Sequence, residues 1–508
     1  MLSEGKNCSL RPRASLLKSG RGYGEPAGSI TLRNQRGSCI IKVATCSTQR
    51  TPTQEKSYVT HAVHTGSPDL HSTLQDAYRA FQAKGLKLNL TRGKPSPAQL
   101  DLSAELLSLP GRTGAYAEDA TDCRNYGGLQ GLAEARRLFS GILGAPPEQV
   151  VVANNSSLAL MHDTVVYSLL KGTCDSALPW SRQGEIAFLC PVPGYDRHFK
   201  ICADYGIRMI PVALRENGPD MDEVESLVAQ DSSIKGIWCV PKYSNPTGAV
   251  YSDAVIERLA AMKTAAPDFR LYWDNAYAVH HLTEERIAIA NILELSERHG
   301  HPNRPLIFAS TSKITLAGAG LALFASSKEN VKWLLARFTP RTIGPDKINQ
   351  LRHVLFLKDE EGILRLMDEH RSLLAPKFQA VLEIFASKLA HVADLSWTRP
   401  KGGYFISLDV PKGCARRVVA LAKQAGIELT PAGATHPHGN DPEDRTIRIA
   451  PTFPDLSEVA QAAEGVAICV LLADAEKLPA HISRTRASAE AVAGRGSDAG
   501  RLRPAEPA

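Results

Sequence analysis

Apolar residues first recur at helical spacing shortly after residue 67, where five of them make one stripe: Leu70, Leu74, Ala77, Tyr78 and Phe81. Gly85 follows this stripe and is expected to end the helix. From about residue 116 the pattern changes, and short apolar runs alternate with amphipathic stretches such as 158–170 and 253–262. The runs predict seven strands, at 150–153, 185–190, 208–213, 236–241, 269–273, 306–309 and 321–326.

Strands that alternate with helices predict a mainly parallel seven-stranded sheet that helices cover on both faces. After residue 354 the pattern gives long helices and then two further strands, at 403–408 and 445–449. The predicted fold class is therefore α/β, with a large domain around the seven-stranded sheet and a smaller α+β domain built from both chain ends.

Domain boundaries follow from these changes of pattern. We expect the large domain to span residues 116–354 and the small domain to combine 67–115 with 355–478. Residues 1–66 and 479–508 lack periodicity and are expected to be disordered. The first segment is rich in Arg and Ser and poor in acidic residues, which is also the composition of an organellar transit peptide. A cytoplasmic location is the leading expectation, and a mitochondrion or plastid is the alternative if residues 1–66 act as such a signal.

Charge and composition exclude several classes of function. The net charge is +6, but much of it falls in the first 50 residues, where Glu4 and Glu25 are the acidic residues. The rest of the chain is closer to neutral, so no nucleic-acid partner is expected. Ten cysteines lie scattered without C-x-x-C spacing, which argues against a metal site or a disulfide framework. No uncharged apolar run reaches about 18 residues, so no membrane span is expected, and 466–473 is predicted to be a core helix.

Polar motifs follow four of the predicted strands, at the edge of a parallel sheet where ligands bind. They are Asn155-Ser156-Ser157, Tyr243-Ser244-Asn245-Pro246-Thr247-Gly248, Asp274-Asn275-Ala276-Tyr277 and Ser310-Thr311-Ser312-Lys313. Each motif alone has an ordinary structural explanation, since Pro and Gly form turns and Ser or Asp caps helices. Their order along the chain is what points to chemistry.

In this order the motifs resemble those of the fold-type I pyridoxal-phosphate enzymes, and within them the aspartate aminotransferase superfamily, over residues 68–473. Three further segments resemble a divergent, mainly bacterial subgroup of aspartate aminotransferases: Lys94-Pro95-Ser96-Pro97, Arg124-Asn125-Tyr126-Gly127-Gly128 and Ile447-Arg448-Ile449-Ala450-Pro451. The resemblance implies pyridoxal 5'-phosphate as the cofactor. It also implies transfer of an amino group from an L-amino acid, with L-aspartate as the leading substrate, to 2-oxoglutarate.

The resemblance implies a role for each residue around the cofactor ring. Lys313 is expected to form a Schiff base with the cofactor and then to shuttle the proton as base and acid. Asp274 would face the pyridine nitrogen and favour its protonated form. Tyr277 and Asn245 would donate to the ring oxygen, and Tyr195 would stack on the ring.

Phosphate and substrate contacts are implied in the same way. Ser156 and Ser157 open a helix whose N-terminus suits an anion, and Ser310 matches a phosphate-binding serine. Tyr126 matches a tyrosine that reaches the phosphate from a partner subunit, which implies a homodimer with shared active sites.

Binding of the substrate is expected to involve three residues. Arg448 matches the arginine that grips the α-carboxylate, because its planar guanidinium can donate two hydrogen bonds. Asn245 is expected to contact the substrate as well, and Gly93 would offer a backbone amide.

The chain departs from the family pattern after Lys313. Most relatives carry an arginine eight or nine residues later that binds the phosphate, but residues 317–322 contain none. The helix dipole, additional hydroxyls, Lys242 and Arg341 are the candidates to replace it. The residue that binds a side-chain carboxylate is equally open, and Arg341, Arg124 and Lys94 are the candidates.

Other functions fit the same sequence. An aminotransferase for alanine or aromatic amino acids, or a lyase or decarboxylase, could use the same scaffold, because a fold does not fix a reaction. A transcription regulator with an aminotransferase-like domain would need a helix-turn-helix module, and residues 1–66 show no pair of amphipathic helices.

Overall fold

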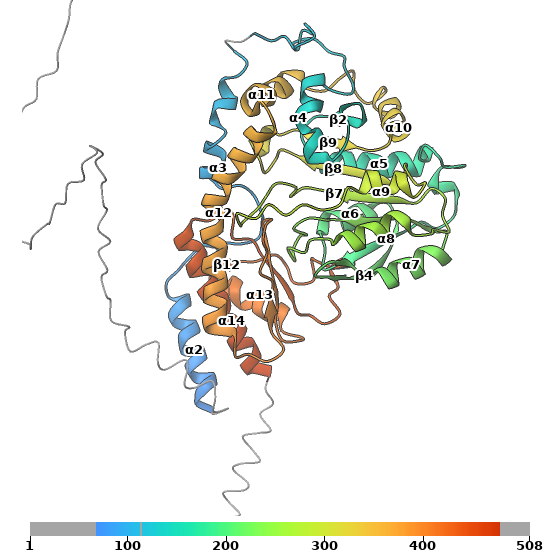
Figure 1. Cartoon of the computed structure of the whole chain (residues 1–508). Helices are drawn as coiled ribbons and strands as arrows, with labels where there is room; N and C mark the ends of the chain where they lie inside the picture. Colours follow the sequence, from blue (N-terminus) through green and yellow to red (C-terminus); the bar gives the residue numbers. More distant parts are fainter. Residues whose placement is uncertain (1–67, 112–113, 478–508) are drawn as a thin grey trace, which may run out of the picture. The chain divides into compact units, whose positions relative to one another are not determined.

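The computed structural model describes residues 68–111 and 114–477. The expected disorder of residues 1–66 and 479–508 therefore lies outside the described residues. The described chain contains one large mixed sheet, two small sheets and the helices that cover them (Figure 1).

Eight strands form the large sheet, in the order β2-β9-β8-β7-β6-β3-β4-β5. Their bounds are β2 Val150–Val152, β3 Ala187–Val192, β4 Arg208–Arg215, β5 Gly218–Pro219, β6 Ile234–Cys239, β7 Arg270–Asp274, β8 Pro305–Ser310 and β9 Ala322–Ala325. Strands β4, β3, β6, β7 and β8 pair in parallel, whereas β9 is antiparallel to both of its neighbours and β5 is antiparallel to β4.

The predicted α/β fold with a mainly parallel central sheet is confirmed, and all seven predicted strands are present. The number of strands in the sheet was too low by one, because β5 was missed. This strand has only two residues, Gly218 and Pro219, and neither favours extended structure. The predicted strand at 403–408 also begins too early, since β11 is Ile406–Asp409. Gly403 has a φ of +82°, which a strand does not accommodate.

Helices cover both faces of the large sheet. Side chains of β7 alternate between the faces: Leu271 and Trp273 join one core and Tyr272 the other. The first core packs against α4 Ala133–Leu143, α7 Met221–Gln230, α8 Asp253–Ala261, α9 Ile292–Arg298 and α11 Lys347–Leu357. The second packs against α5 Ser157–Lys171, α6 Asp196–Asp204 and α10 Lys328–Phe338.

A separate core forms around the two small sheets. Their strands are β1 Leu88–Asn89 with β12 Ile427–Glu428, and β10 Ser396–Trp397 with β11 and β13 Thr446–Ile449. Helices α2 Pro68–Gln82, α13 Ala415–Gln424 and α14 Leu456–Lys477 pack there, so that segments from both ends of the described chain lie side by side (Figure 1). The predicted domain boundaries stay a prediction.

One long helix joins the two regions. Helix α12, Glu360–Leu389, contributes Ile363 to the core of the large sheet and Phe385 to the core of the small sheets. The short helix α3, Pro97–Asp101, contacts α12. Because α12 runs from one core into the other, it sets the separation between the two regions.

Helix α14 is long and apolar enough to span a membrane by length and composition alone. In its 18-residue apolar window, 61% is buried in the protein. Val459, Val466 and Val470 are fully buried in the core of the small sheets. The packing agrees with the core helix predicted around 466–473.

A buried ion pair fastens the large sheet at the start of β6 and β7. Asp268 accepts hydrogen bonds from Lys235, Ser176, Trp180 and Gln183, with Lys235 Nζ 2.8 Å from Asp268 Oδ1. Both charged side chains are less than 5% exposed. Burial opposes ionisation of Asp268, but these hydrogen bonds outweigh it and lower the pKa of its carboxyl.

Asp268→Ala should lower the free energy of unfolding by about 3–5 kcal/mol, because Lys235 is left as a buried charge without its counterion. Urea unfolding measures this loss. The control is Glu285→Ala, which breaks the exposed pair with Lys401 and should cost no more than about 1 kcal/mol. Equal effects of the two substitutions would contradict the role given to burial.

Candidate active site

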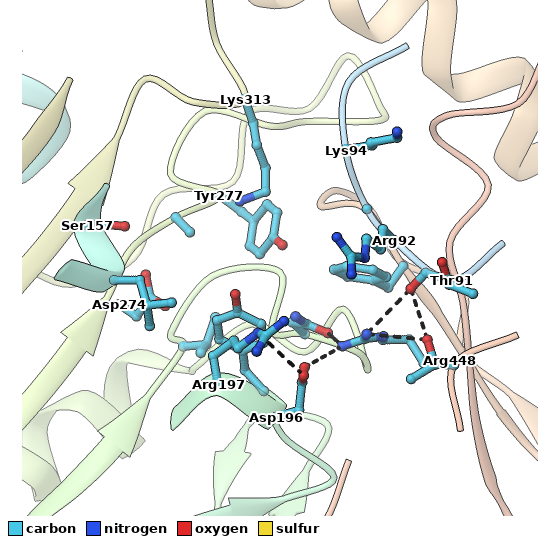
Figure 2. Close-up of a pocket in the computed structure, with 18 of the residues that line it drawn as sticks. Thr91, Arg92, Lys94, Ser157, Asp196, Arg197, Asp274, Tyr277, Lys313 and Arg448 are labelled. Atoms are coloured by element: carbon cyan, nitrogen blue, oxygen red, sulfur yellow. Dashed lines mark hydrogen bonds and ion pairs between the residues drawn. The ribbon is translucent and has the colours of Figure 1, made fainter. Parts of the chain in front are cut away.

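A cavity of about 610 Å³ lies at the carboxyl ends of β6 and β7, where the region of the small sheets faces the large sheet. Eight residues that were predicted from the sequence line it: Gly93, Ser157, Tyr195, Asn245, Asp274, Tyr277, Lys313 and Arg448. Figure 2 shows Asp274 and Ser157 on one side of the cavity and Arg92 and Arg448 on the other.

Asp274 ends β7 and is 4% exposed. Its Oδ2 accepts a hydrogen bond from His198 Nε2 at 3.0 Å, and the His198 ring stacks on Trp238 with their centroids 4.3 Å apart. Oδ1 of Asp274 is buried and has no partner among the described residues. A buried carboxylate oxygen without a partner is costly, so this oxygen suits a donor or cation supplied by a ligand.

Lys313 reaches the cavity from the loop after β8. Its ammonium lies 4.8 Å from the centroid of the Tyr277 ring, and its carbonyl oxygen accepts from His280 Nε2 at 3.3 Å. Burial lowers the pKa of Lys313, and the charge of Asp274 offsets part of that change. A lowered pKa increases the neutral, nucleophilic fraction of the amine. Burial also raises the pKa of Tyr277, which keeps its hydroxyl protonated and able to donate.

Arg448 is held from several directions before any substrate binds. Its guanidinium donates to Asp196 Oδ1 at 3.1 Å, Asn245 Oδ1 at 3.4 Å and Thr430 Oγ1 at 3.3 Å. It lies over the Phe405 ring, 5.0 Å from the centroid. Its Nε is buried with no partner in the described part of the chain. Because Asn245 accepts through Oδ1, its amide nitrogen is left to donate elsewhere.

Tyr195 comes immediately before α6 and lines the cavity. Its ring meets His198 edge-on, with the centroids 5.0 Å apart. Burial, reinforced by the negative charge of Asp274, raises the pKa of Tyr195 to about 12. The ring is therefore a neutral aromatic surface at the edge of the cavity, as stacking on a cofactor requires.

Three predicted cofactor residues do not line the cavity. Ser156 is the N-cap of α5 and accepts from the Ala159 amide, at a φ of 100° that is unusual for a residue with a side chain. Ser310 is buried at the end of β8. Tyr126 is 77% exposed. Ser157, by contrast, begins α5 and lines the cavity, so the helix N-terminus does face it.

Gly93 fixes the path of a loop across the cavity. A Cβ at this position would lie 2.4 Å from Cζ of Phe405, so any other residue would have to displace that ring. The carbonyl oxygen of Thr91 accepts from Thr430 Oγ1 at 2.9 Å, and that of Lys94 from Thr452 Oγ1 at 3.1 Å. The loop of residues 91–94 is thus tied down on both sides of Gly93.

Some residues were considered as replacements for the missing phosphate-binding arginine or as ligands of a side-chain carboxylate. These residues lie in different places. Lys242 faces a second cavity, of about 310 Å³, where burial lowers its pKa to about 8. Arg341 pairs with Asp163 at 2.7 Å. Arg124 pairs with Asp122 and does not line the first cavity. Lys94 does line it, with its ammonium 3.9 Å from the centroid of the Phe453 ring.

Sequence reasoning missed His198, Arg92 and Arg197. The spacing of Tyr195 and His198 was a usable signal, because residues three apart share one face of a helix. Arg92 and Arg197 both line the cavity, yet each belongs to a segment whose position depends on tertiary packing. No local pattern distinguishes them from the other arginines of the chain.

The residues of the cavity fit pyridoxal phosphate. A ring nitrogen that carries a proton would satisfy the free Oδ1 of Asp274, Lys313 offers an amine of lowered pKa, and Ser157 presents a helix N-terminus to an anion. With the parallel sheet and the polar groups at its carboxyl edge, these features define a pyridoxal-phosphate-dependent aminotransferase of fold type I.

Comparison with known proteins agrees with this class. Residues 63–481 match the model of the aspartate amino-transferase family, and the chain belongs to that family. It is 57% identical over 410 residues to a protein of Mycolicibacterium smegmatis named as an aminotransferase, covering 80% of this chain and 96% of the relative.

Two solved structures are similar to this chain. A crystal structure of an aspartate transaminase from Corynebacterium glutamicum has 51% identity and a TM-score of 0.78, with 80% of this chain and 96% of that one covered. An α-aminoadipate aminotransferase of Thermus thermophilus, solved with a phosphopyridoxyl derivative of leucine, has 22% identity and a TM-score of 0.64, with coverage of 78% and 96%. The second likeness concerns the fold.

His198→Leu should weaken binding of pyridoxal phosphate about ten- to a hundredfold, because Asp274 loses its hydrogen bond and its charge becomes harder to keep buried. Titration of the apoprotein with the cofactor, followed by absorbance, measures the affinity. His299→Leu is the matched control, since His299 is partly exposed and pairs with Glu257 outside the cavity. An unchanged affinity in His198→Leu would remove the role given to this histidine.

Proposed function

We propose that the enzyme transfers the amino group of L-aspartate to 2-oxoglutarate, with the cofactor held by Lys313 as a Schiff base. The observation that carries the substrate class is the charge of the cavity. Besides Lys313, which the cofactor would occupy, four basic side chains line it, against the two carboxylates of Asp196 and Asp274: Arg92, Lys94, Arg197 and Arg448. Aspartate and 2-oxoglutarate each bring two carboxylates, which such a surplus of positive charge favours.

The residues of this chain divide the work of the reaction. When bound, pyridoxal phosphate supplies an aldehyde carbon and a ring that stabilises negative charge developing at Cα. Arg448 orients the α-carboxylate, because its guanidinium is held in place by Asp196, Asn245 and Thr430. Once the substrate's amino group has replaced it on the cofactor, the freed amine of Lys313 would take the proton from Cα and deliver it to the cofactor carbon, for which a lowered pKa is suitable.

A relative supports aspartate as the amino donor. The chain is 51% identical over 406 residues to a protein of Corynebacterium glutamicum named aspartate aminotransferase, and 94% of that relative is covered. Small hydrophobic substrates would leave the extra cations of the cavity without a partner.

We also propose a homodimer in which Tyr126 reaches the site of the partner subunit. Tyr126 and Ile343 are 77% and 65% exposed, and the segments beside them touch, since a Cβ at Gly344 would lie 2.5 Å from the Gly127 carbonyl oxygen.

Sedimentation at micromolar concentration should give the mass of two chains. Tyr126→Phe should weaken cofactor binding through the lost hydroxyl, and a single-chain mass would contradict the proposal.

Adding L-aspartate alone to the cofactor-loaded protein tests the reaction. The visible band of the bound cofactor should disappear, and pyridoxamine phosphate and oxaloacetate should form in equal amounts. A band that persists with aspartate but is lost with alanine or an aromatic amino acid would move the enzyme to another substrate. Release of ammonia or carbon dioxide without pyridoxamine phosphate would identify a lyase or decarboxylase instead.

Two lysine variants complete this test. Lys313→Ala should abolish both the visible band and the conversion of aspartate. Among the described residues, Lys94 is the other lysine that lines the cavity, and its ammonium lies against Phe453 and not where the aldehyde would bind. Lys242→Met removes another lysine of lowered pKa, from the neighbouring cavity, and should keep the band. A band retained in Lys313→Ala would overturn the assignment of this lysine.

A further inference from the structure

We propose that Arg92 is the residue that binds the side-chain carboxylate of the substrate and so selects dicarboxylic amino acids. This inference rests on the proposed function and names the group responsible for its specificity. It begins from the cations of the cavity and from what each of them already contacts.

Four of the five basic side chains are engaged. Lys313 belongs to the cofactor, and Arg448 is held by Asp196 at 3.1 Å. Lys94 lies against the ring of Phe453, and the half-exposed Arg197 makes only a long ion pair, with its Nε 3.8 Å from Asp196 Oδ2. Arg92 is exposed and lines the cavity, and its guanidinium makes no hydrogen bond or ion pair with any described residue. An arginine without a counterion in a cavity for anions is available to a ligand.

The backbone places Arg92 beside the α-carboxylate site. Thr91, the residue before it, has a carbonyl oxygen 3.5 Å from Arg448 Nη2. Gly93, the residue after it, packs against the Phe405 ring, over which the Arg448 guanidinium lies. Arg92 is therefore flanked by two contacts to the surroundings of Arg448. Figure 2 shows its side chain entering the cavity on the side of Arg448, opposite Asp274.

This position matches the shape of the substrate. With its α-carboxylate on Arg448 and its amino group at the cofactor, an amino acid would lie beside the loop of residues 91–94, which also lines the cavity. The loop is where the free guanidinium lies. A planar guanidinium can donate two parallel hydrogen bonds to a carboxylate, and an uncharged side chain would leave it without a partner.

Other arginines that could serve have partners of their own. Arg341 pairs with Asp163 and Arg124 with Asp122. Neither lines the cavity of its own chain. A second subunit could bring either of them to the cavity, so the experiment includes Arg341.

The test compares L-aspartate with L-alanine, which differ by one carboxylate, in single turnovers of the cofactor-loaded enzyme. Arg92→Gln should lower the second-order rate constant for aspartate about ten- to a hundredfold. The second-order rate constant for alanine should change less than about twofold. Arg92→Lys should recover part of the loss, because lysine keeps the positive charge but lacks the two parallel donors of a guanidinium. Arg365→Gln is the control, since Arg365 is an exposed residue of α12 outside the cavity.

Binding without turnover gives an independent measurement. Succinate and butyrate have the same chain length and differ by one carboxylate, so calorimetry with the cofactor-loaded enzyme isolates the second charge. The wild type should bind succinate more tightly, and Arg92→Gln should reduce this preference about ten- to a hundredfold with butyrate unchanged.

Three results would overturn the inference. One is an equal loss for aspartate and alanine in Arg92→Gln, which would mean that the residue only shapes the loop. Another is that Arg341→Gln loses the preference for aspartate over alanine while Arg92→Gln keeps it. The third is a wild type that converts aspartate no faster than alanine, and this result alone would also remove aspartate from the proposed function.

Discussion

The buried carboxylate of Asp274 is the interaction on which the rest of the active site depends. A charge that is 4% exposed is tolerated only if its oxygens are bonded. His198 satisfies one oxygen from α6, and the stacking of His198 on Trp238 keeps that donor in place. The second oxygen is left for the cofactor. The same negative charge acts on Lys313, where it opposes the effect of burial on the pKa. One carboxylate therefore influences both the ring and the amine that the reaction needs.

The order and direction of the strands in the large sheet bring the residues of the active site together. Strands β6, β7 and β8 are neighbours and run parallel, so the residues that follow them lie at one edge. Arg448 comes from β13 of a small sheet, and Arg92 from the loop after β1. The helix α12 packs into the cores of both regions and sets their separation. A shift of either region would move Arg448 relative to Lys313, and a misplacement of about 1 Å in an active site can cost two orders of magnitude in rate.

Much of this arrangement could be predicted from the sequence, for physical reasons. Buried parallel strands are continuous apolar runs, so β3, β6, β7 and β8 were found to within about two residues. The motifs after them gave Asn245, Asp274 and Lys313. The two-residue strands β1, β5, β10 and β12 were not found, because two residues carry no periodicity. His198 was not found because its partner Asp274 is distant in the chain. Arg92 was not found because folding alone brings its loop beside Arg448.

Arg448 and Arg92 also differ in how firmly they are held, and this difference suits an aminotransferase. The proposed reaction requires the enzyme to accept both aspartate, whose carboxylates are separated by two carbons, and 2-oxoglutarate, in which they are separated by three. Arg448 is fixed by contacts to Asp196, Asn245, Thr430 and Phe405, so in the proposed reaction it would hold the α-carboxylate, and with it the reacting carbon, in one position. Arg92 has an anchored backbone but a side chain without a partner among the described residues. Such a side chain can follow a carboxylate that lies one carbon nearer or farther, so a rigid site and an adjustable one together accept both substrates at the same reacting atoms.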